Sequence, residues 1–210
     1  MLTHTVAGVS EEPRRRRAPA MSPEDRREAI VQATLPLVVM AGANVTTSQI
    51  AAAAGIAEGT VFRVFKDKAE LLDSCVQRAL RSDEEVARLE AIPTDVPLAE
   101  RLTSGVATFS GYLDRMWGLI GTLRETGYQP HDEEQKKHKG PPIGMQQLSE
   151  AVAGLFGEEE LRVSPDLAAR MLLGAVFTNR MGAGFGQTTA EPEAIVDLFL
   201  HGALKGETDE

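Results

Sequence analysis

Residues 46–72 read TTSQIAAAAGIAEGTVFRVFKDKAELL, and the fold of the N-terminal part of the chain can be predicted from this stretch. Thr46 and Gln49 have the spacing of a capping box, so we expect a helix that runs from Thr46 to Ala54. Gly55 then supplies the left-handed residue that commonly ends a helix. The first half of the stretch therefore predicts one short helix followed by a tight turn.

The second half of the same stretch predicts another short helix, from Ala57 to Phe65. Val61 and Phe65 lie one helical turn apart and should face inward. Ala57 is a weak start for this helix because it has no side-chain oxygen to cap it, which costs about 1 kcal/mol. Two short helices separated by a glycine-containing turn form a helix-turn-helix, whose second helix fits the major groove of duplex DNA.

Glycines, threonines and apolar residues recur through this region in a characteristic order. They are Gly42, Thr46, Thr47, Ile50, Ala51, Ala54, Gly55, Gly59, Thr60, Phe65, Lys68, Leu71 and Leu72. With these positions, the order and spacing of residues 22–80 resemble the TetR family of repressors. The resemblance implies an all-α fold, in which a three-helix, helix-turn-helix DNA-binding domain precedes a helical domain for ligand binding and dimerisation. The rest of the chain agrees with the family only in helix number and length.

Apolar residues at helical spacing predict further helices on both sides of this stretch. Ser22 can cap a helix that reaches Gly42, with a kink at Pro36. A single long helix is expected from Asp67 to about Ala91. Four more are expected over 98–125, 143–156, 165–185 and 191–204, which suits an all-α architecture of about nine helices.

Charge divides the chain into parts that should have different partners. Residues 1–70 hold nine basic and eight acidic residues, whereas residues 71–210 hold thirteen basic and twenty-three acidic ones. DNA phosphates would repel the acidic part, which should therefore point away from the duplex. We divide the chain into a disordered basic arm (1–21), a helix-turn-helix DNA-binding domain (22–68) and an effector-binding and dimerisation domain (69–210).

The candidate DNA contacts are the polar and small side chains that the helix-turn-helix presents outward. The resemblance implies phosphate or groove contacts for Thr46, Gln49, Thr60 and Lys68. Gln49 and Arg63 are our candidates for reading base edges, because glutamine can pair with adenine and arginine with guanine. The full set is Arg14, Arg15, Arg16, Arg17, Thr46, Thr47, Ser48, Gln49, Gly59, Thr60, Phe62, Arg63 and Lys68.

The arginine run belongs to this set because of a departure from the family. Phe62 and Val64 stand where the family commonly has tyrosine and then histidine or tyrosine, so two polar groups that seek phosphate are absent. We hypothesise that the arm replaces them by entering the adjacent minor groove, whose negative potential attracts arginine. The alternative is a solvated tail without contact to DNA.

Apolar and methionine side chains of the second domain are candidates for an effector pocket, because adaptable methionines and aromatic rings suit an apolar ligand. Plain core packing is the alternative for each of them. The resemblance places a homodimer interface on the last two helices. The pocket candidates are Phe109, Leu113, Met116, Trp117, Ile120, Met145, Leu148, Phe177 and Met181.

Composition narrows the class of protein. Apolar runs are too short to cross a membrane, and the one cysteine excludes an intrachain disulfide framework, so a cytoplasmic bacterial protein is expected. We expect no metal, cofactor or catalytic role, because no Ser/His/Asp, Cys/His or paired-carboxylate arrangement is evident.

The prediction is a repressor that binds a near-palindromic operator as a dimer and is released by a small, largely apolar molecule. A helical enzyme and a protein-binding adaptor are the rivals.

Overall fold

The computed structural model describes residues 21–129, 142–157, 161–183 and 186–202. Every regular element in this part of the chain is helical, which confirms the all-α prediction. The elements are α1 (Pro23–Ala41), the 3-10 turn η1 (Gly42–Asn44), α2 (Thr47–Ala54), α3 (Glu58–Val64), α4 (Lys68–Ala79), α5 (Asp83–Glu90), α6 (Leu98–Glu125), α8 (Ile143–Gly154), α9 (Pro165–Ala183) and α10 (Pro192–His201).

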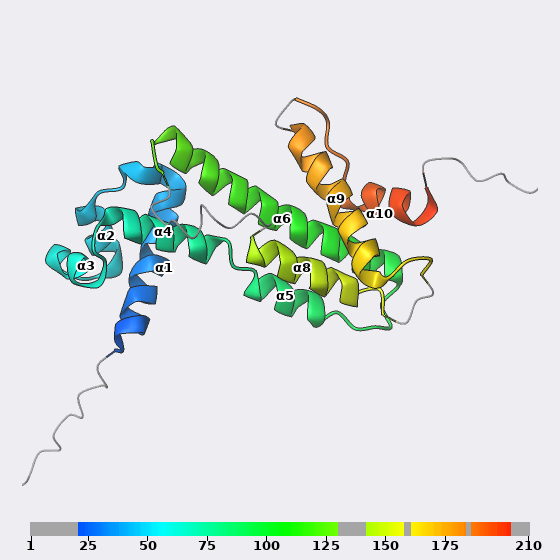
Figure 1. Cartoon of the computed structure of the whole chain (residues 1–210), viewed down its shortest axis with the longest axis horizontal. Helices are drawn as coiled ribbons and strands as arrows, with labels where there is room; N and C mark the ends of the chain where they lie inside the picture. Colours follow the sequence, from blue (N-terminus) through cyan, green and yellow to red (C-terminus); the bar gives the residue numbers. More distant parts are fainter. Residues whose placement is uncertain (1–20, 130–141, 158–160, 184–185, 203–210) are drawn as a thin grey trace, which may run out of the picture.

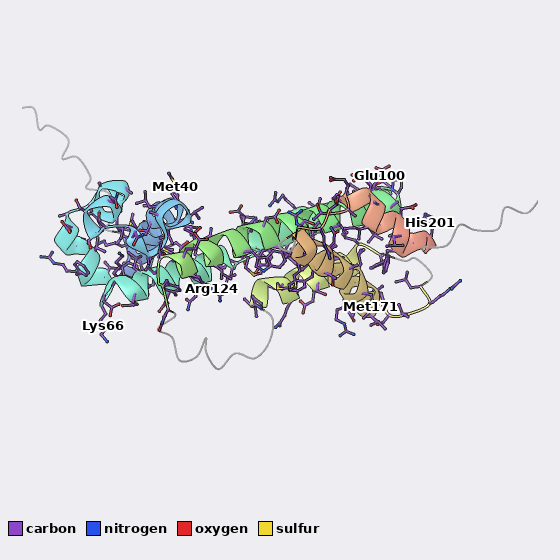
Figure 2. All side chains as sticks on the ribbon, turned by 90° about the horizontal axis from the view of Figure 1, so that it is seen from above. Met40, Lys66, Glu100, Arg124, Met171 and His201 are labelled. Carbon is purple, nitrogen blue, oxygen red and sulfur yellow. The ribbon has the colours of Figure 1, made fainter. Side chains whose placement is uncertain are left out.

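The molecule is elongated, with two helical clusters joined by one long helix (Figure 1). We call α1 to α4 the head and α5 to α10 the body. Helix α6 belongs to both clusters: Figure 2 shows Arg124, near its end, beside the head, and Glu100, near its start, at the far end of the body. None of the described helices is both long and apolar enough to span a membrane.

The head confirms the local signals in the sequence. The Ser22 hydroxyl caps α1 by accepting from the N–H of Asp25 at 3.0 Å, and α1 continues through Pro36 to its end. Thr46 and Gln49 form both bonds of the capping box at the start of α2. Gly55 ends α2 in the left-handed region, with φ 65° and ψ 31°. Local chemistry therefore sets the bounds of these short helices.

The head core is formed by apolar side chains from all four of its helices and from the last turns of α6. Because α6 supplies two leucines, the head is not closed by its own residues alone. The core consists of Ile30, Val31, Val38, Val45, Ile50, Ala51, Val61, Phe65, Leu71, Leu72, Cys75, Val76, Leu119 and Leu123.

The single helix expected from Asp67 to Ala91 is wrong, because α4 and α5 are separate helices with a break at residues 80–82. That Leu-Arg-Ser sequence contains neither glycine nor proline, which are the usual signals of a break. A prediction from the spacing of apolar residues therefore gives one continuous helix where the structure has two. Tertiary contacts hold the break. The hydroxyl of Tyr112 on α6 donates to the carbonyl of Leu80 at 2.9 Å.

The body core lies between α6, α8, α9 and α10, with α5 covering one side. Figure 1 shows α9 crossing α6 obliquely, while α8 lies beside α5. The fully buried side chains include Leu102, Val106, Leu113, Leu148, Val152, Phe156, Ala169, Leu172 and Val176.

Candidate functional site

Helix α3 lies at the outer side of the head and exposes one face. Val61 and Phe65 are buried behind it, 3% and 1% exposed, as the sequence pattern predicts. Arg63 is exposed and Phe62 is 50% exposed, while Thr60 is half-buried. Helix α3 therefore presents a cationic and an aromatic side chain to the surroundings on a short, well-anchored helix.

Arg27 on α1 fixes the end of α3, a role that sequence patterning missed. Its guanidinium lies over the Phe65 ring, 4.3 Å from the centroid. It also donates to the carbonyl of Val64 at 3.3 Å and to the hydroxyl of Ser74 on α4 at 2.9 Å. One side chain therefore joins α1, the end of α3 and α4.

Glu70 completes this arrangement at the turn between α3 and α4. Its carboxylate pairs with Arg27 at 2.8 Å and accepts from the backbone N–H of Lys66 at 2.6 Å. The hydrogen bond from Lys66 and the charge of Arg27 lower the pKa of Glu70 below its ordinary value, despite partial burial. Asp67 caps α4 by accepting from the N–H of Glu70 at 2.9 Å, so the exit from α3 is firmly held.

The start of α2 carries further DNA-contact candidates, and one of them is already engaged. The side-chain oxygen of Gln49 accepts from the backbone N–H of Thr46 at 2.8 Å and from its hydroxyl at 3.0 Å. A bidentate pair with adenine needs this oxygen, so base reading by Gln49 would require the cap to be exchanged. Thr47 is half-buried, and Ser48 and Gly59 are exposed.

Lys68 is held in place by the backbone between α1 and α2. Its ammonium donates to the carbonyl of Ala43 at 2.5 Å and is half-buried. The N–H of Ala43 donates in turn to the hydroxyl of Thr126, just past α6, at 2.8 Å. Lys68 therefore connects α4 to η1, and Thr126 holds η1 against the end of α6. The arginine run at 14–17 lies outside the described residues.

The body contains a groove lined by residues of α8 and α9 and by Phe109 of α6. Its volume is about 730 Å³, within the range of small-molecule sites. Of the predicted pocket residues, Phe109, Met145 and Phe177 line it. The Trp117 ring contacts the Phe177 ring edge-on, with centroids 5.4 Å apart, and so stands beside the lining.

The remaining pocket candidates lie elsewhere. Leu113, Met116 and Leu148 are buried in the body core, and Ile120 packs against that core. Met181 is 45% exposed at the surface of α9. Plain core packing therefore accounts for the first four.

Sequence patterning missed the polar side of the groove. Acidic, basic and amide side chains come from the exposed positions of α8 and α9, where helical spacing alone cannot separate a ligand contact from a solvated face. The polar lining residues are Gln146, Ser149, Glu150, Asp166, Arg170 and Thr178.

The outer face of α9 and α10 exposes large apolar side chains. Met171 is 59% exposed and Leu198 is 51% exposed, and Figure 2 shows Met171 at the surface of the body. Gly174 and Ala175 lie exposed on the same helix as Met171. Small residues between larger apolar ones allow another helix to approach closely.

A short helix exposed on a firmly held helix-turn-helix, joined to a helical body, is an arrangement typical of helix-turn-helix DNA-binding regulators. The family model described as "Bacterial regulatory proteins, tetR family" matches residues 30–75. Residues 30–75, which span α2, α3 and parts of α1 and α4, are thus similar to the regulatory proteins of the TetR family.

Solved structures of transcriptional regulators share the fold over more than four-fifths of this chain. A TetR-family regulator from Mesorhizobium loti is 18% identical, with coverage of 86% of this chain and 97% of that one and a TM-score of 0.61. A TetR/AcrR-family regulator from Thermobifida fusca is 22% identical, with coverage of 86% and 100% and a TM-score of 0.57. The regulator FadR from Bacillus subtilis, in complex with stearoyl-CoA, is 18% identical, with coverage of 84% and 99% and a TM-score of 0.54.

Proposed function

We propose that this chain is a TetR-family transcriptional repressor that binds a near-palindromic operator as a homodimer and releases it when a small, largely apolar molecule occupies the groove between α8 and α9. The exposed face of α3 carries the proposal. Arg63 and Phe62 lie outside while Val61 and Phe65 anchor the helix, which is the arrangement needed to enter a major groove.

We propose that Arg63 contacts the base edges in the major groove. It is exposed on α3, and a guanidinium can donate two parallel hydrogen bonds to guanine. Further candidates for phosphate or groove contacts lie at the start of α2 and on α3: Thr46, Thr47, Ser48, Gly59 and Thr60. The Phe62 ring is suited to the methyl group of thymine.

The dimer is proposed to form through the outer face of α9 and α10. The exposed side chains of Met171, Met181 and Leu198 supply apolar area on these two helices, and burying it against a second copy would stabilise the dimer. Two heads held at a fixed separation would bind two half-sites, which explains why the proposed operator is near-palindromic.

The groove supports an effector with an apolar part and a polar end. Phe109, Leu173 and Phe177 offer apolar surface, and Arg170 lies with Asp166 on the α9 side. FadR of Bacillus subtilis, which shares the fold, binds stearoyl-CoA, an apolar chain joined to a polar group. We infer the same general chemistry for the effector of this chain, without its identity.

Base reading by Arg63 is tested with duplexes that the protein selects from a random-sequence library. Arg63→Ala should raise the Kd for the selected duplex by roughly fivefold to 150-fold, equivalent to about 1–3 kcal/mol, and should relax the preference at one position of each half-site. Fluorescence anisotropy measures the Kd. Arg162→Ala is the matched control: it removes an equal charge from an exposed position before α9 and should change the Kd by less than about twofold.

The outcomes separate this proposal from its rivals. Equal losses in Arg63→Ala and Arg162→Ala would mean that net charge, not α3, determines binding. If the library yields no enriched duplex, the head binds protein or acts as a scaffold, and the repressor proposal fails.

A further inference from the structure

The break between α4 and α5 is held by the body, not by its own sequence. In a continuous helix, the carbonyl of Leu80 would accept from the backbone four residues later. It accepts instead from the hydroxyl of Tyr112, at 2.9 Å. Burial raises the pKa of Tyr112 to about 12, so this hydroxyl keeps its proton near neutral pH and remains a donor.

Helix α8 contacts the same break. Gly144 lies so close that a Cβ atom there would be 2.3 Å from the Leu80 carbonyl oxygen and 2.7 Å from the Tyr112 hydroxyl. Ser82 is completely buried, and its hydroxyl bonds the side-chain oxygen of Gln147 at 3.1 Å. The break therefore exists where α8 presses against the chain.

The sequence at the break also allows a capping box at the start of α5, and this structure does not contain that box. Ser82 and Glu85 have the spacing of a capping box at the start of α5. Within the described structure, the Ser82 hydroxyl caps no backbone N–H of α5 and bonds Gln147 instead. The Glu85 carboxylate pairs with Arg115 of α6 at 2.9 Å and with Arg88 at 3.2 Å. Both members of the box have partners outside it, so the break has two competing sets of bonds.

Helix α8 also forms one wall of the groove. Met145, Gln146 and Ser149 line the groove, while Gly144 and Gln147 on the same helix touch the break. A helix of twelve residues moves largely as one body, because its backbone is hydrogen-bonded throughout. A ligand that displaces α8 therefore acts directly on Gln147.

The other side of the break moves with the head. Leu72 and Cys75 of α4 belong to the head core, and Arg78 pairs with Glu28 of α1 at 3.0 Å. Leu89 of α5 belongs to the body core. The angle between α4 and α5 is therefore one determinant of how the head is oriented on the body.

We propose that Ser82 and Gln147 form a latch that transmits occupancy of the groove to the head. An occupant that displaces α8 separates Gln147 from Ser82, which then caps α5, and the angle at the break changes. The latch controls DNA release only if the chain is the ligand-responsive repressor proposed above. An occupant can shift this equilibrium only as far as it prefers the open latch.

The test fills the groove with a covalent probe and measures hydrogen exchange at the break. Ser149→Cys is alkylated with monobromobimane, a small aromatic reagent, and the adduct is verified by mass. Cys75 stays unlabelled because it is buried, and burial raises the pKa of its thiol to about 12. The adduct should make the amides of residues 80–83 exchange at least several-fold faster, while the head core at 30–38 is unchanged.

Two controls separate the latch from general damage. The same adduct on Ser104→Cys, an exposed site on α6 outside the groove lining, should leave exchange at residues 80–83 unaltered. Gln147→Ala without an adduct should reproduce the faster exchange, and adding the adduct should cause no further change. Met145→Cys is a second attachment site if Ser149→Cys does not fold.

Either of two results overturns the latch: an adduct in the groove that leaves residues 80–83 unchanged, or additive effects of the adduct and Gln147→Ala. Failure of the proposed function looks different. If the adduct opens the break but leaves affinity for the selected duplex unaltered, the latch stands and the role of the groove in releasing DNA fails.

Discussion

Arg27 stabilises the head by more than the free energy of a single exposed ion pair. Its pair with Glu70 is more than a third exposed on both sides, so that pair alone is worth at most about 1 kcal/mol. The hydrogen bonds to Val64 and Ser74 and the contact with the Phe65 ring add to it. Together they are worth roughly 1–3 kcal/mol.

Arg27→Ala should therefore lower the free energy of unfolding by about 1–3 kcal/mol at pH 7. Urea denaturation followed by circular dichroism measures it. Arg26→Ala, at an exposed neighbouring position, is the control and should change the free energy by less than about 0.5 kcal/mol. Equal effects of the two substitutions would show that the contacts of Arg27 do not stabilise the head.

The effect of Arg27→Ala should also depend on pH. Because the pKa of Glu70 is lowered in the folded protein, its contribution is complete above the ordinary value of 4.5 and is lost as the pH falls through the lowered value. Part of that contribution is the pair with Arg27, which the variant lacks. The stability difference between the two proteins should narrow below pH 4.5, and a constant difference would contradict the role of the pair.

At the scale of elements, α6 joins the head to the body. Its early turns pack in the body core, and Leu119 and Leu123 pack in the head core. Past its end, the hydroxyl of Tyr128 bonds the carboxylate of Asp73 on α4. The end of α1 meets α6 so closely that a Cβ atom on Gly42 would be 2.3 Å from the Thr126 hydroxyl oxygen and 2.6 Å from the Thr122 carbonyl oxygen.

Gly42→Ala should strongly destabilise the protein. Gly42 has a φ of 55°, and the added methyl group would collide with the Thr122 backbone and the Thr126 side chain, so a loss of roughly 2–4 kcal/mol in the free energy of unfolding is expected. Urea denaturation again measures it. Gly118→Ala is the control, since a Cβ atom there meets none of the described atoms, and it should stabilise α6 by roughly 0.5–1 kcal/mol. A neutral Gly42→Ala would show that the head and α6 can separate at little cost.

At the scale of the whole molecule, the two surfaces that we propose to bind DNA and a second copy lie on different parts. Helix α3 belongs to the head, whereas α9 and α10 lie in the body (Figure 1). A body that dimerises therefore sets the separation of two heads. The acidic composition of residues 71–210 favours the same arrangement, because it keeps the body away from phosphate.

Met171→Asp should dissociate the proposed dimer. A carboxylate buried without a partner costs several kcal/mol, so the dimer Kd should rise at least about a hundredfold. Sedimentation velocity measures the Kd. Ile143→Asp places the same charge at an exposed apolar position on α8 and should leave the dimer intact. A parent protein that sediments as a monomer at micromolar concentration would refute the interface on α9 and α10.

Local sequence signals were sufficient to predict the short helices of the head and the exposed face of α3. Ser22, the Thr46–Gln49 box and Gly55 act on backbone groups within four residues of themselves, so their effects are local and readable. The inward direction of Val61 and Phe65 follows from helical periodicity in the same way. The family resemblance over this stretch rests on the same local positions.

Long-range contacts, by contrast, produce the break between α4 and α5, hold Lys68 against Ala43 and set the composition of the groove. At the break, Tyr112 lies thirty-two residues from its partner Leu80, and Gln147 lies sixty-five residues from its partner Ser82. The spacing of apolar residues within one helix does not indicate contacts between residues so far apart in the sequence. Helical spacing likewise identified apolar positions in the body but did not separate Leu148, in the core, from Met145, in the groove. Burial depends on which helices meet, and the packing of the whole chain determines that.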